Sequence, residues 1–236
     1  MVDIAHRGRK FKIDGVSADD HLVKLLAKSG KFYEIDLLGY IEAIQDVLPP
    51  GVVVDVGANI GNHTVFLAEF VGRPVVAFEP NPDVLGLLER NLAVNGSKVE
   101  VVRKGLGAEP GRGTAVIDDA ANAGNAHLDT SGGDLEITTM DAQLGGQRVA
   151  LIKVDVEGME LQVLQGAVET LKKSQPHLFL EAATRKHFRE LRDFLAPLGY
   201  RPIVRWAYTP VWHFAPNPSV GLRVRARWLR VTRWFR

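Results

Sequence analysis

The sequence contains no cysteine. A disulfide framework, a thiolate metal site and a cysteine nucleophile are therefore all excluded. No apolar run approaches the ~20 residues that span a bilayer. The first residues, Met1–Arg7, also lack the basic-then-apolar pattern of a signal peptide. We therefore expect a soluble protein of the cytoplasm.

Acidic residues are missing from one end of the chain. Residues 220–236 contain six arginines and no aspartate or glutamate. The whole chain has 29 basic and 28 acidic side chains, which leaves 23 basic against 28 acidic ones in the other 219 residues. Because this body is mildly acidic, it offers no basic face for nucleic acid, and we expect no nucleic-acid partner.

Short β-type apolar runs alternate with amphipathic helices along most of the chain, which is typical of an α/β protein with a doubly wound, mostly parallel sheet. We expect residues 1–48 to be a small N-terminal addition with a short strand near 11–13, residues 49–215 to be the main domain, and residues 216–236 to be a basic, aromatic tail. Seven strands are expected near 52–56, 75–79, 99–103, 149–154, 178–180, 202–206 and 211–214. Helices are expected near 19–28, 36–48, 62–71, 82–95, 160–172 and 188–195. Residues 105–147 are expected to be an irregular insert with β segments near 114–117 and 135–138.

The first of these strands leads into a glycine turn. Val52–Val54 is β-branched and reads as a buried strand, which stops at Asp55 and continues into Gly57, Asn59 and Gly61. In open α/β sheets ligands bind at the carboxyl ends of strands, and glycine allows a sharp turn and a close approach. We therefore assign all four turn residues to a cofactor site.

The spacing of this turn distinguishes two cofactors. Dinucleotides are bound by G-x-G-x-x-G, whose backbone N–H groups face a pyrophosphate. Here the pattern is Asp-x-Gly-x-x-x-Gly, and the acid would repel a phosphate. A carboxylate suits an ammonium or sulfonium group instead. The turn therefore predicts S-adenosylmethionine rather than NAD.

The next two strand ends support a nucleoside site. Val75–Phe78 ends at Glu79, 24 residues after Asp55, and an acid in this place is the usual partner of ribose hydroxyls. After the third strand, Gly105 lies where the adenine packs in this architecture, and its backbone groups would read the base.

Several segments together resemble the FkbM family of methyltransferases. They are 53–61, 77–82 and 152–167, with 31–34 resembling the family's entry segment. The resemblance covers roughly residues 30–205, and the Lys-x-Asp-x-Glu-Gly-x-Glu stretch from Lys153 is its most specific part. It implies the Rossmann-like class I methyltransferase fold and an O-methyltransferase acting on a hydroxyl of a sugar, glycolipid or polyketide. S-Adenosylmethionine would be the methyl donor and S-adenosylhomocysteine the product.

Methyl transfer to a hydroxyl requires alignment of the acceptor and removal of its proton. Asp155 ends the fourth strand and is our first candidate for the base, although it could also cap a helix or contact the cofactor's amino group. Glu157 is the second, because one of two neighbouring carboxylates tends to have a raised pKa; it could also be a first-turn acid favoured by the helix dipole. His127 in the insert is an alternative base.

Three further residues are assigned to the acceptor. They are Asn125 in the insert, Glu181 at the end of the fifth strand and Glu34 in the entry segment. An oxygen-rich Mg²⁺ site made by Asp155, Glu157, Glu181 and His127 stays open. We expect no metal.

Other functions are weighed against the same residues. A methyltransferase acting on nucleobase amines needs an Asn/Asp-Pro-Pro-aromatic segment after the fourth strand, where this chain has residues 155–158, Asp-Val-Glu-Gly. Cysteine-dependent pyrimidine methylation is excluded. A non-catalytic module that only binds S-adenosylmethionine, and an enzyme for a polyketide or other small molecule, remain as alternatives.

The tail has helical periodicity. Val224, Trp228, Val231 and Phe235 fall on one face, and arginines 223, 227 and 230 form an adjacent strip. Tryptophan and arginine suit the surface of an anionic membrane, so we expect a peripheral contact through residues 220–236 at the inner membrane face. The alternatives are a helix packed on the protein's own body, an oligomer contact and a disordered end. The sequence leaves the oligomeric state open.

Overall fold

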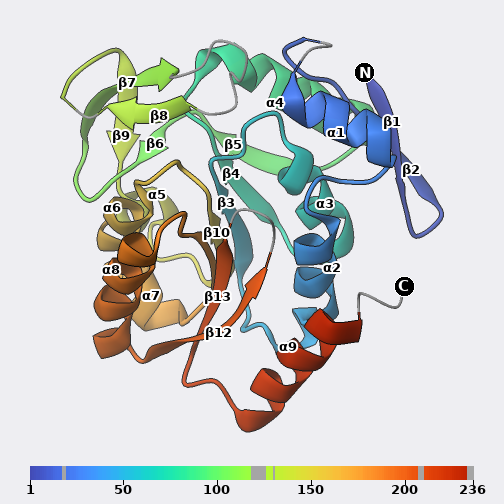
Figure 1. Ribbon diagram of the computed structural model, residues 1–236. Coiled ribbons are helices and arrows are strands. Elements are labelled where there is room, and N and C mark those ends of the chain that lie inside the picture. Colours follow the sequence, from blue (N-terminus) through green and yellow to red (C-terminus); the bar gives the residue numbers. More distant parts are fainter. Residues whose placement is uncertain (18–19, 118–125, 130, 207–209, 233–236) are drawn as a thin grey trace.

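A computed structural model describes residues 1–17, 20–117, 126–129, 131–206 and 210–232. Its centre is a seven-stranded sheet in the order β12-β13-β11-β10-β3-β4-β5 (Figure 1). The strands are β3 (Val52–Val56), β4 (Val75–Phe78), β5 (Val99–Val102), β10 (Val149–Val154), β11 (His177–Glu181), β12 (Tyr200–Trp206) and β13 (Val211–Pro216). Only β13 runs antiparallel to both neighbours. The predicted mostly parallel α/β sheet is therefore confirmed.

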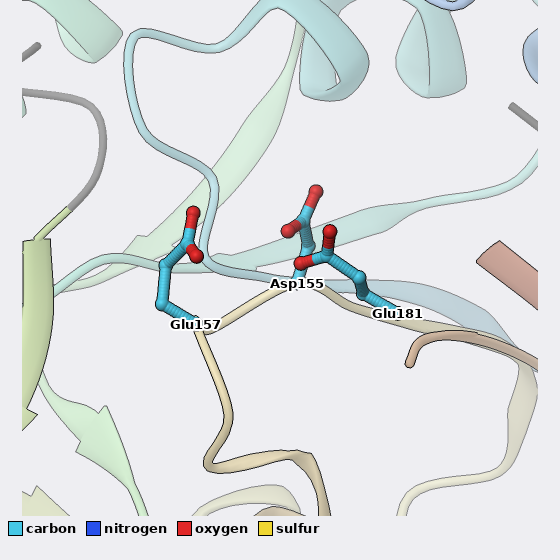
Figure 2. A group of neighbouring side chains, drawn as sticks. All are labelled: Asp155, Glu157 and Glu181. Atoms are coloured by element: carbon cyan, nitrogen blue, oxygen red, sulfur yellow. The ribbon is translucent and has the colours of Figure 1, made fainter. Parts of the chain in front are cut away.

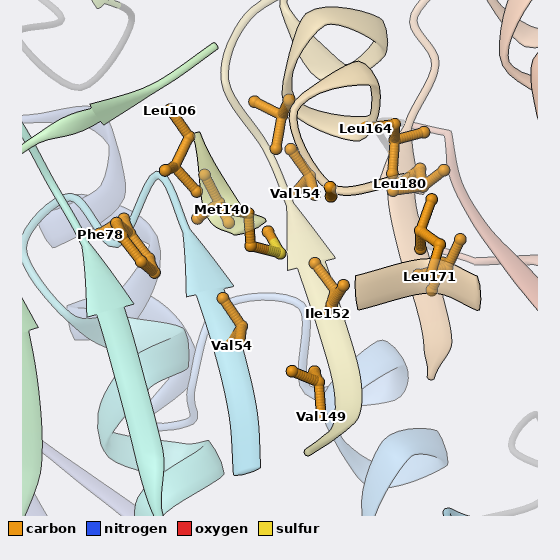
Figure 3. Close-up of a cluster of buried hydrophobic side chains, with 14 of the residues drawn as sticks. Val54, Phe78, Leu106, Met140, Val149, Ile152, Val154, Leu164, Leu171 and Leu180 are labelled. Carbon is orange, nitrogen blue, oxygen red and sulfur yellow. The ribbon is translucent and has the colours of Figure 1, made fainter. Parts of the chain in front are cut away.

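Helices cover both faces of this sheet because its strands are apolar on both sides. Val52, Val54 and Val56 pack toward one face, whereas Val53 packs toward the other. The first face carries α5 (Met140–Leu144), α6 (Glu160–Gln165), α7 (Val168–Ser174) and α8 (Arg185–Leu195). The second carries α2 (Ile35–Ala43), α3 (Asn62–Phe70), α4 (Pro82–Asn95) and α9 (Val220–Thr232). Figure 3 shows the first of these cores, where Ile152 and Val154 of β10 pack near Leu164 and Leu171.

One predicted helix is divided in two. Residues 160–172 were expected to be continuous, but α6 ends at Gln165 and α7 begins at Val168. A Cβ on Gly166 would lie 2.0 Å from the carbonyl oxygen of Gly107. The chain beyond β5 therefore packs directly against the backbone at this glycine, and the helix is interrupted there.

The N-terminal addition contains a hairpin that the sequence only half indicated. β2 (Arg9–Ile13) includes the predicted segment, and it pairs with β1 (Val2–His6), which was not expected. The hairpin is followed by α1 (His21–Ser29). Asn91 and Asn95 of α4 hydrogen-bond to the backbone around β2, so the hairpin is fixed on the main domain.

The insert is more regular than predicted. It forms a small sheet in the order β6-β9-β7-β8, which lies above the carboxyl edge of the central sheet in Figure 1. Its strands are β6 (Gly105–Leu106), β7 (Gly111–Ile117), β8 (Ala126–Asp129) and β9 (Leu135–Thr138). The β segments expected near 114–117 and 135–138 are confirmed. Within the described residues, no helix has the length and apolar character needed to cross a membrane.

Candidate active site

A pocket opens at the carboxyl edge of the sheet, between the turns after β3 and β10. Gly57 has a φ of +79°, and a Cβ there would lie 2.0 Å from the carbonyl oxygen of Asp155. The amide of Asp155 in turn donates to the carbonyl of Val56. Gly61 has a φ of +89°, and its Cβ would lie 2.7 Å from the Leu88 side chain. The fold itself therefore requires glycine at both positions, whether or not a ligand also approaches the backbone there.

Glu79 lies in the pocket wall with its carboxylate already oriented. One oxygen accepts a hydrogen bond from the backbone amide of Asn59 at 2.8 Å, and the other accepts one from the backbone amide of Asn81 at 2.9 Å. Burial raises the pKa of Glu79, although the two amides act in the opposite direction. Four other predicted cofactor residues, Gly57, Asn59, Gly105 and Asp155, also line this pocket, and Gly61 starts α3 beside it.

Asp55 was expected to face the cofactor, and the structure corrects this. Its side chain is fully buried and does not line the pocket. It accepts a 2.7 Å hydrogen bond from the Thr64 hydroxyl of α3, and its other oxygen lies 3.4 Å from the Lys153 amine. Side chains alternate along β3, so this position points toward α3 and lies beneath the pocket floor.

Lys153 connects Asp55 to the pocket. Its side chain is 2% exposed, and its amine lies 3.4 Å from both Asp55 Oδ1 and Asp155 Oδ2. Burial alone would lower the pKa of Lys153, but the two carboxylates outweigh it and raise that pKa above its ordinary value. For Asp155, burial would raise the pKa, and the Lys153 charge lowers it. Asp155 is therefore ionised at neutral pH, and its side chain is 30% exposed.

Glu181, at the end of β11, completes a carboxyl pair with Asp155. Burial and the neighbouring Asp155 charge raise the pKa of Glu181 to about 9. At neutral pH Glu181 therefore keeps its proton and donates a hydrogen bond to Asp155. The pair therefore carries a single proton at neutral pH, and the raised pKa of Glu181 assigns that proton to Glu181.

Glu157 adds a third carboxylate on the turn after β10. Its φ is +52°, unusual for a residue with a side chain, and it is exposed. Oxygens of Asp155, Glu157 and Glu181 lie within 4.8 Å of one another (Figure 2). The structure thus brings together three of the four residues considered for a metal site.

Glu160 fixes the turn that carries Glu157. It is fully buried, and one of its oxygens accepts from the amides of Val156 and Gly158 at 3.1 and 3.4 Å. Its other oxygen lies 3.2 Å from His187 of α8. Burial raises the pKa of Glu160. The shape of this turn therefore depends on a residue that does not touch the pocket.

His63 lines the pocket and was missed by the sequence analysis. Burial and the Lys153 charge lower the pKa of His63 to about 4, so its ring is neutral at pH 7. Its Nε2 lies 3.5 Å from Glu34, whose φ is +55°. Glu34, predicted to bind the acceptor, does not itself line the pocket and lies behind His63. The only signal was the place of His63 at the start of the helix after Gly61.

Two predicted residues of the insert stay predictions. Asn125 lies outside the described residues. The backbone of His127 belongs to β8 and pairs with Val116, but its side chain is outside the described part of the structure.

Curated proteins similar to this chain are named as methyltransferases. Methyltransferase 1 of Beauveria bassiana is 29% identical over 158 residues, covering 54% of this chain and 64% of the relative. Hexuronic acid methyltransferase AglP of Haloferax volcanii is 34% identical over 126 residues, covering 51% and 52%. The chain thus spans only about half to two-thirds of the length of these relatives.

Two solved structures share the fold. A methyltransferase FkbM from Methylobacillus flagellatus superposes with a TM-score of 0.54 at 22% identity, covering 70% of this chain and 43% of that one. A methyltransferase from Geobacter sulfurreducens gives 0.51 at 15% identity, covering 87% and 89%. The model of the methyltransferase FkbM domain matches residues 55–202, which is more than half of the chain. The chain therefore belongs to the FkbM methyltransferase family.

Proposed function

We propose that this protein transfers a methyl group from S-adenosylmethionine to a hydroxyl of a sugar, glycan or related acceptor. The observation that carries the proposal is the ionised, partly exposed carboxylate of Asp155. It faces the same pocket as the preoriented carboxylate of Glu79. One carboxylate would hold the nucleoside and the other the acceptor hydroxyl.

The pocket fits the proposed cofactor at both of its ends. α3 begins at Gly61 without a side-chain cap, and Asn62 and His63 of its first turn line the pocket. The uncapped start of a helix favours an anion, such as the carboxylate of the methionine part. Glu79 would accept from the ribose hydroxyls, and the apolar side chains of Phe78 and Leu106 would flank the adenine. When bound, the cofactor would supply a methyl group activated by its sulfonium.

Asp155 would orient the acceptor hydroxyl and receive its proton. The low pKa of Asp155 makes it a weak base, so the proton moves late, when the hydroxyl has become acidic through its developing bond to the methyl carbon. Lys153 and the proton of Glu181 hold Asp155 in its ionised form and fixed orientation. Neutral His63 adds a polar wall without adding charge.

A sugar-like acceptor is supported by the polar surroundings of Asp155. Exposed Glu157 is an acceptor for the neighbouring hydroxyls of a polyol. The relative from Haloferax volcanii is named a hexuronic acid methyltransferase, and it is 34% identical over about half of each chain. A polyketide hydroxyl would use the same base and fewer of these polar contacts.

The proposal does not require a metal ion. Lys153 lies beside Asp155, and the proton of Glu181 removes one negative charge from the carboxyl cluster, so less negative charge is left for a metal ion to offset. We expect turnover to be unchanged by EDTA. Loss of turnover in EDTA that only Mg²⁺ restores would assign the three carboxylates to a metal instead.

The test is a methyl-transfer assay with S-adenosylmethionine and a panel of sugars, glycans and polyketides. Formation of S-adenosylhomocysteine together with an O-methylated sugar or glycan is expected. Isothermal titration with S-adenosylhomocysteine separates the alternatives. Binding without methylation of any panel member would favour the non-catalytic module, and absence of binding would overturn the cofactor assignment.

A further inference from the structure

Helix α9 packs on the domain through one face. Ala226 is fully buried, and Leu229 packs against the core between α2 and β12. Arg225 pairs with Asp46 at 2.8 Å and also binds the carbonyl of Ala43. Arg223 donates to the carbonyl of Pro202. One alternative for the tail, a helix packed on the protein's own body, is therefore what the structure shows for this face.

The opposite face of α9 is an exposed apolar stripe. Val220, Val224, Trp228 and Val231 are 77%, 61%, 58% and 60% exposed. At 3.6 residues per turn they fall within an arc of about 80°. They are half of the eight large apolar side chains that are exposed in the described part of the chain. Such a concentration on one helix marks an interaction surface.

The charges beside the stripe indicate what it binds. Arg227 and Arg230 are exposed, and neither forms an ion pair with any described residue. α9 contains no acidic side chain. Pairing of two copies through their stripes would bring these arginines together, which is unfavourable. An anionic surface would satisfy both the arginines and the apolar side chains.

We propose that α9 docks on an anionic lipid bilayer. The stripe would enter the boundary between headgroups and acyl chains, and Arg227 and Arg230 would contact lipid phosphates. Trp228 is suited to this boundary because its ring is amphipathic. Phe235, which the sequence analysis placed on this surface, lies outside the described residues.

The docking surface is remote from the pocket. α9 contacts the far end of α2 and β12, whereas the pocket is at the carboxyl edge of β3, β4 and β10 (Figure 1). A docked molecule would therefore keep its pocket open to water. The proposal is independent of the reaction proposed above, and the two can fail separately.

The experiment is co-sedimentation of the full chain with vesicles of phosphatidylcholine, with or without phosphatidylglycerol. The protein should pellet with the anionic vesicles only, and less so as salt rises, because screening weakens the arginine contacts. The double variant Arg227→Gln/Arg230→Gln should weaken binding about thirtyfold. The double variant Val224→Gln/Trp228→Gln should weaken it at least about tenfold.

Matched controls alter exposed residues elsewhere. Val94→Gln on α4 replaces a valine that is 45% exposed, and Arg189→Gln on α8 replaces an exposed arginine. Both should bind as the unaltered chain does. Removal of α9 is less suitable as a test because it would uncover Val204 and Trp206 of the core. Circular dichroism checks that every variant is folded.

Two results would overturn the proposal. One is the absence of any difference on anionic vesicles: either both double variants pellet as much as the unaltered chain, or the unaltered chain does not pellet at all. The other is a dimer in analytical ultracentrifugation that Val224→Gln/Trp228→Gln dissociates, without vesicle binding, which would assign the stripe to a second copy of the chain.

Discussion

The two halves of the pocket hold their carboxylates in different ways. On the side of β4, Glu79 is fixed by two backbone amides, and no other side chain is needed to orient it. On the side of β10 and β11, Asp155 depends on Lys153 and Glu181, which are side chains with protonation states of their own. The first arrangement is rigid and local. The second is a coupled network.

This difference predicts how each half responds to substitution. Backbone amides stay in place when a neighbouring side chain changes, so the effect of altering Glu79 should be confined to cofactor binding. In the network each charge sets the proton affinity of the next, so a change at one residue reaches the others. The orientation of the carboxylate that would bind the cofactor is thus fixed by the backbone. The protonation states in the half that would perform the chemistry depend on neighbouring side chains and change when those are substituted.

The largest effect is expected for Asp155→Asn. The variant keeps the size of the side chain but loses the carboxylate that would take the acceptor's proton. Turnover should fall roughly 10²–10⁴-fold, as for loss of a general base. Affinity for S-adenosylhomocysteine, measured by isothermal titration, should change much less. Retained turnover would move the role to Glu157 or His127.

Lys153→Met should have the next largest effect, on stability. It leaves the fully buried Asp55 without its cationic partner. Removing one partner of a buried ion pair costs about 3–5 kcal/mol of unfolding free energy. The double variant Asp55→Asn/Lys153→Met should recover a large part of this loss in urea denaturation. If the single variant is as stable as the unaltered protein, the pair does not hold the pocket floor.

The contrast between the halves also shows what the sequence can predict. The strand runs and the acids that end them placed Glu79, Asp155 and Glu181 at one edge, because parallel strands share their carboxyl edge. The direction in which a single side chain points was harder to predict from the sequence. Asp55 points beneath the floor, and Gly57 is required by the carbonyl of Asp155, a contact between segments about 100 residues apart.

Long-range packing accounts for the remaining differences. The break of the helix at Gly166 depends on its contact with Gly107, and no local pattern records that contact. His63 of α3 and Glu34 of the N-terminal addition are 29 residues apart in sequence and are brought together by the packing of these two segments. The helical character of the tail followed from its periodicity, but which of its faces would be buried depended on Asp46 and β12.

Glu79→Ala should weaken binding of S-adenosylhomocysteine about ten- to a hundredfold. The ribose hydroxyls would lose a charged acceptor, worth about 1.5–3 kcal/mol. Isothermal titration measures the change, and Glu181→Gln is the matched control, with cofactor affinity expected to stay within about threefold because its carboxyl belongs to the other half. Unchanged affinity of Glu79→Ala would show that this residue does not hold the ribose.

Glu181→Gln should change the pH dependence of stability. The folded protein holds the Glu181 proton up to a pKa of about 9, whereas the unfolded chain releases it near 4.5. Between these values the folded state binds the extra proton, so the stability that Glu181 contributes is complete below pH 4.5 and is lost as the pH rises through 9. Glutamine keeps a hydrogen-bond donor toward Asp155 and cannot titrate. The melting temperature of the variant, relative to the unaltered protein, should therefore increase steadily from pH 5 to pH 9. A difference in melting temperature that does not vary with pH would mean that Glu181 is already ionised in the folded protein. The assignment of a shared proton to Glu181 and Asp155 would then be wrong.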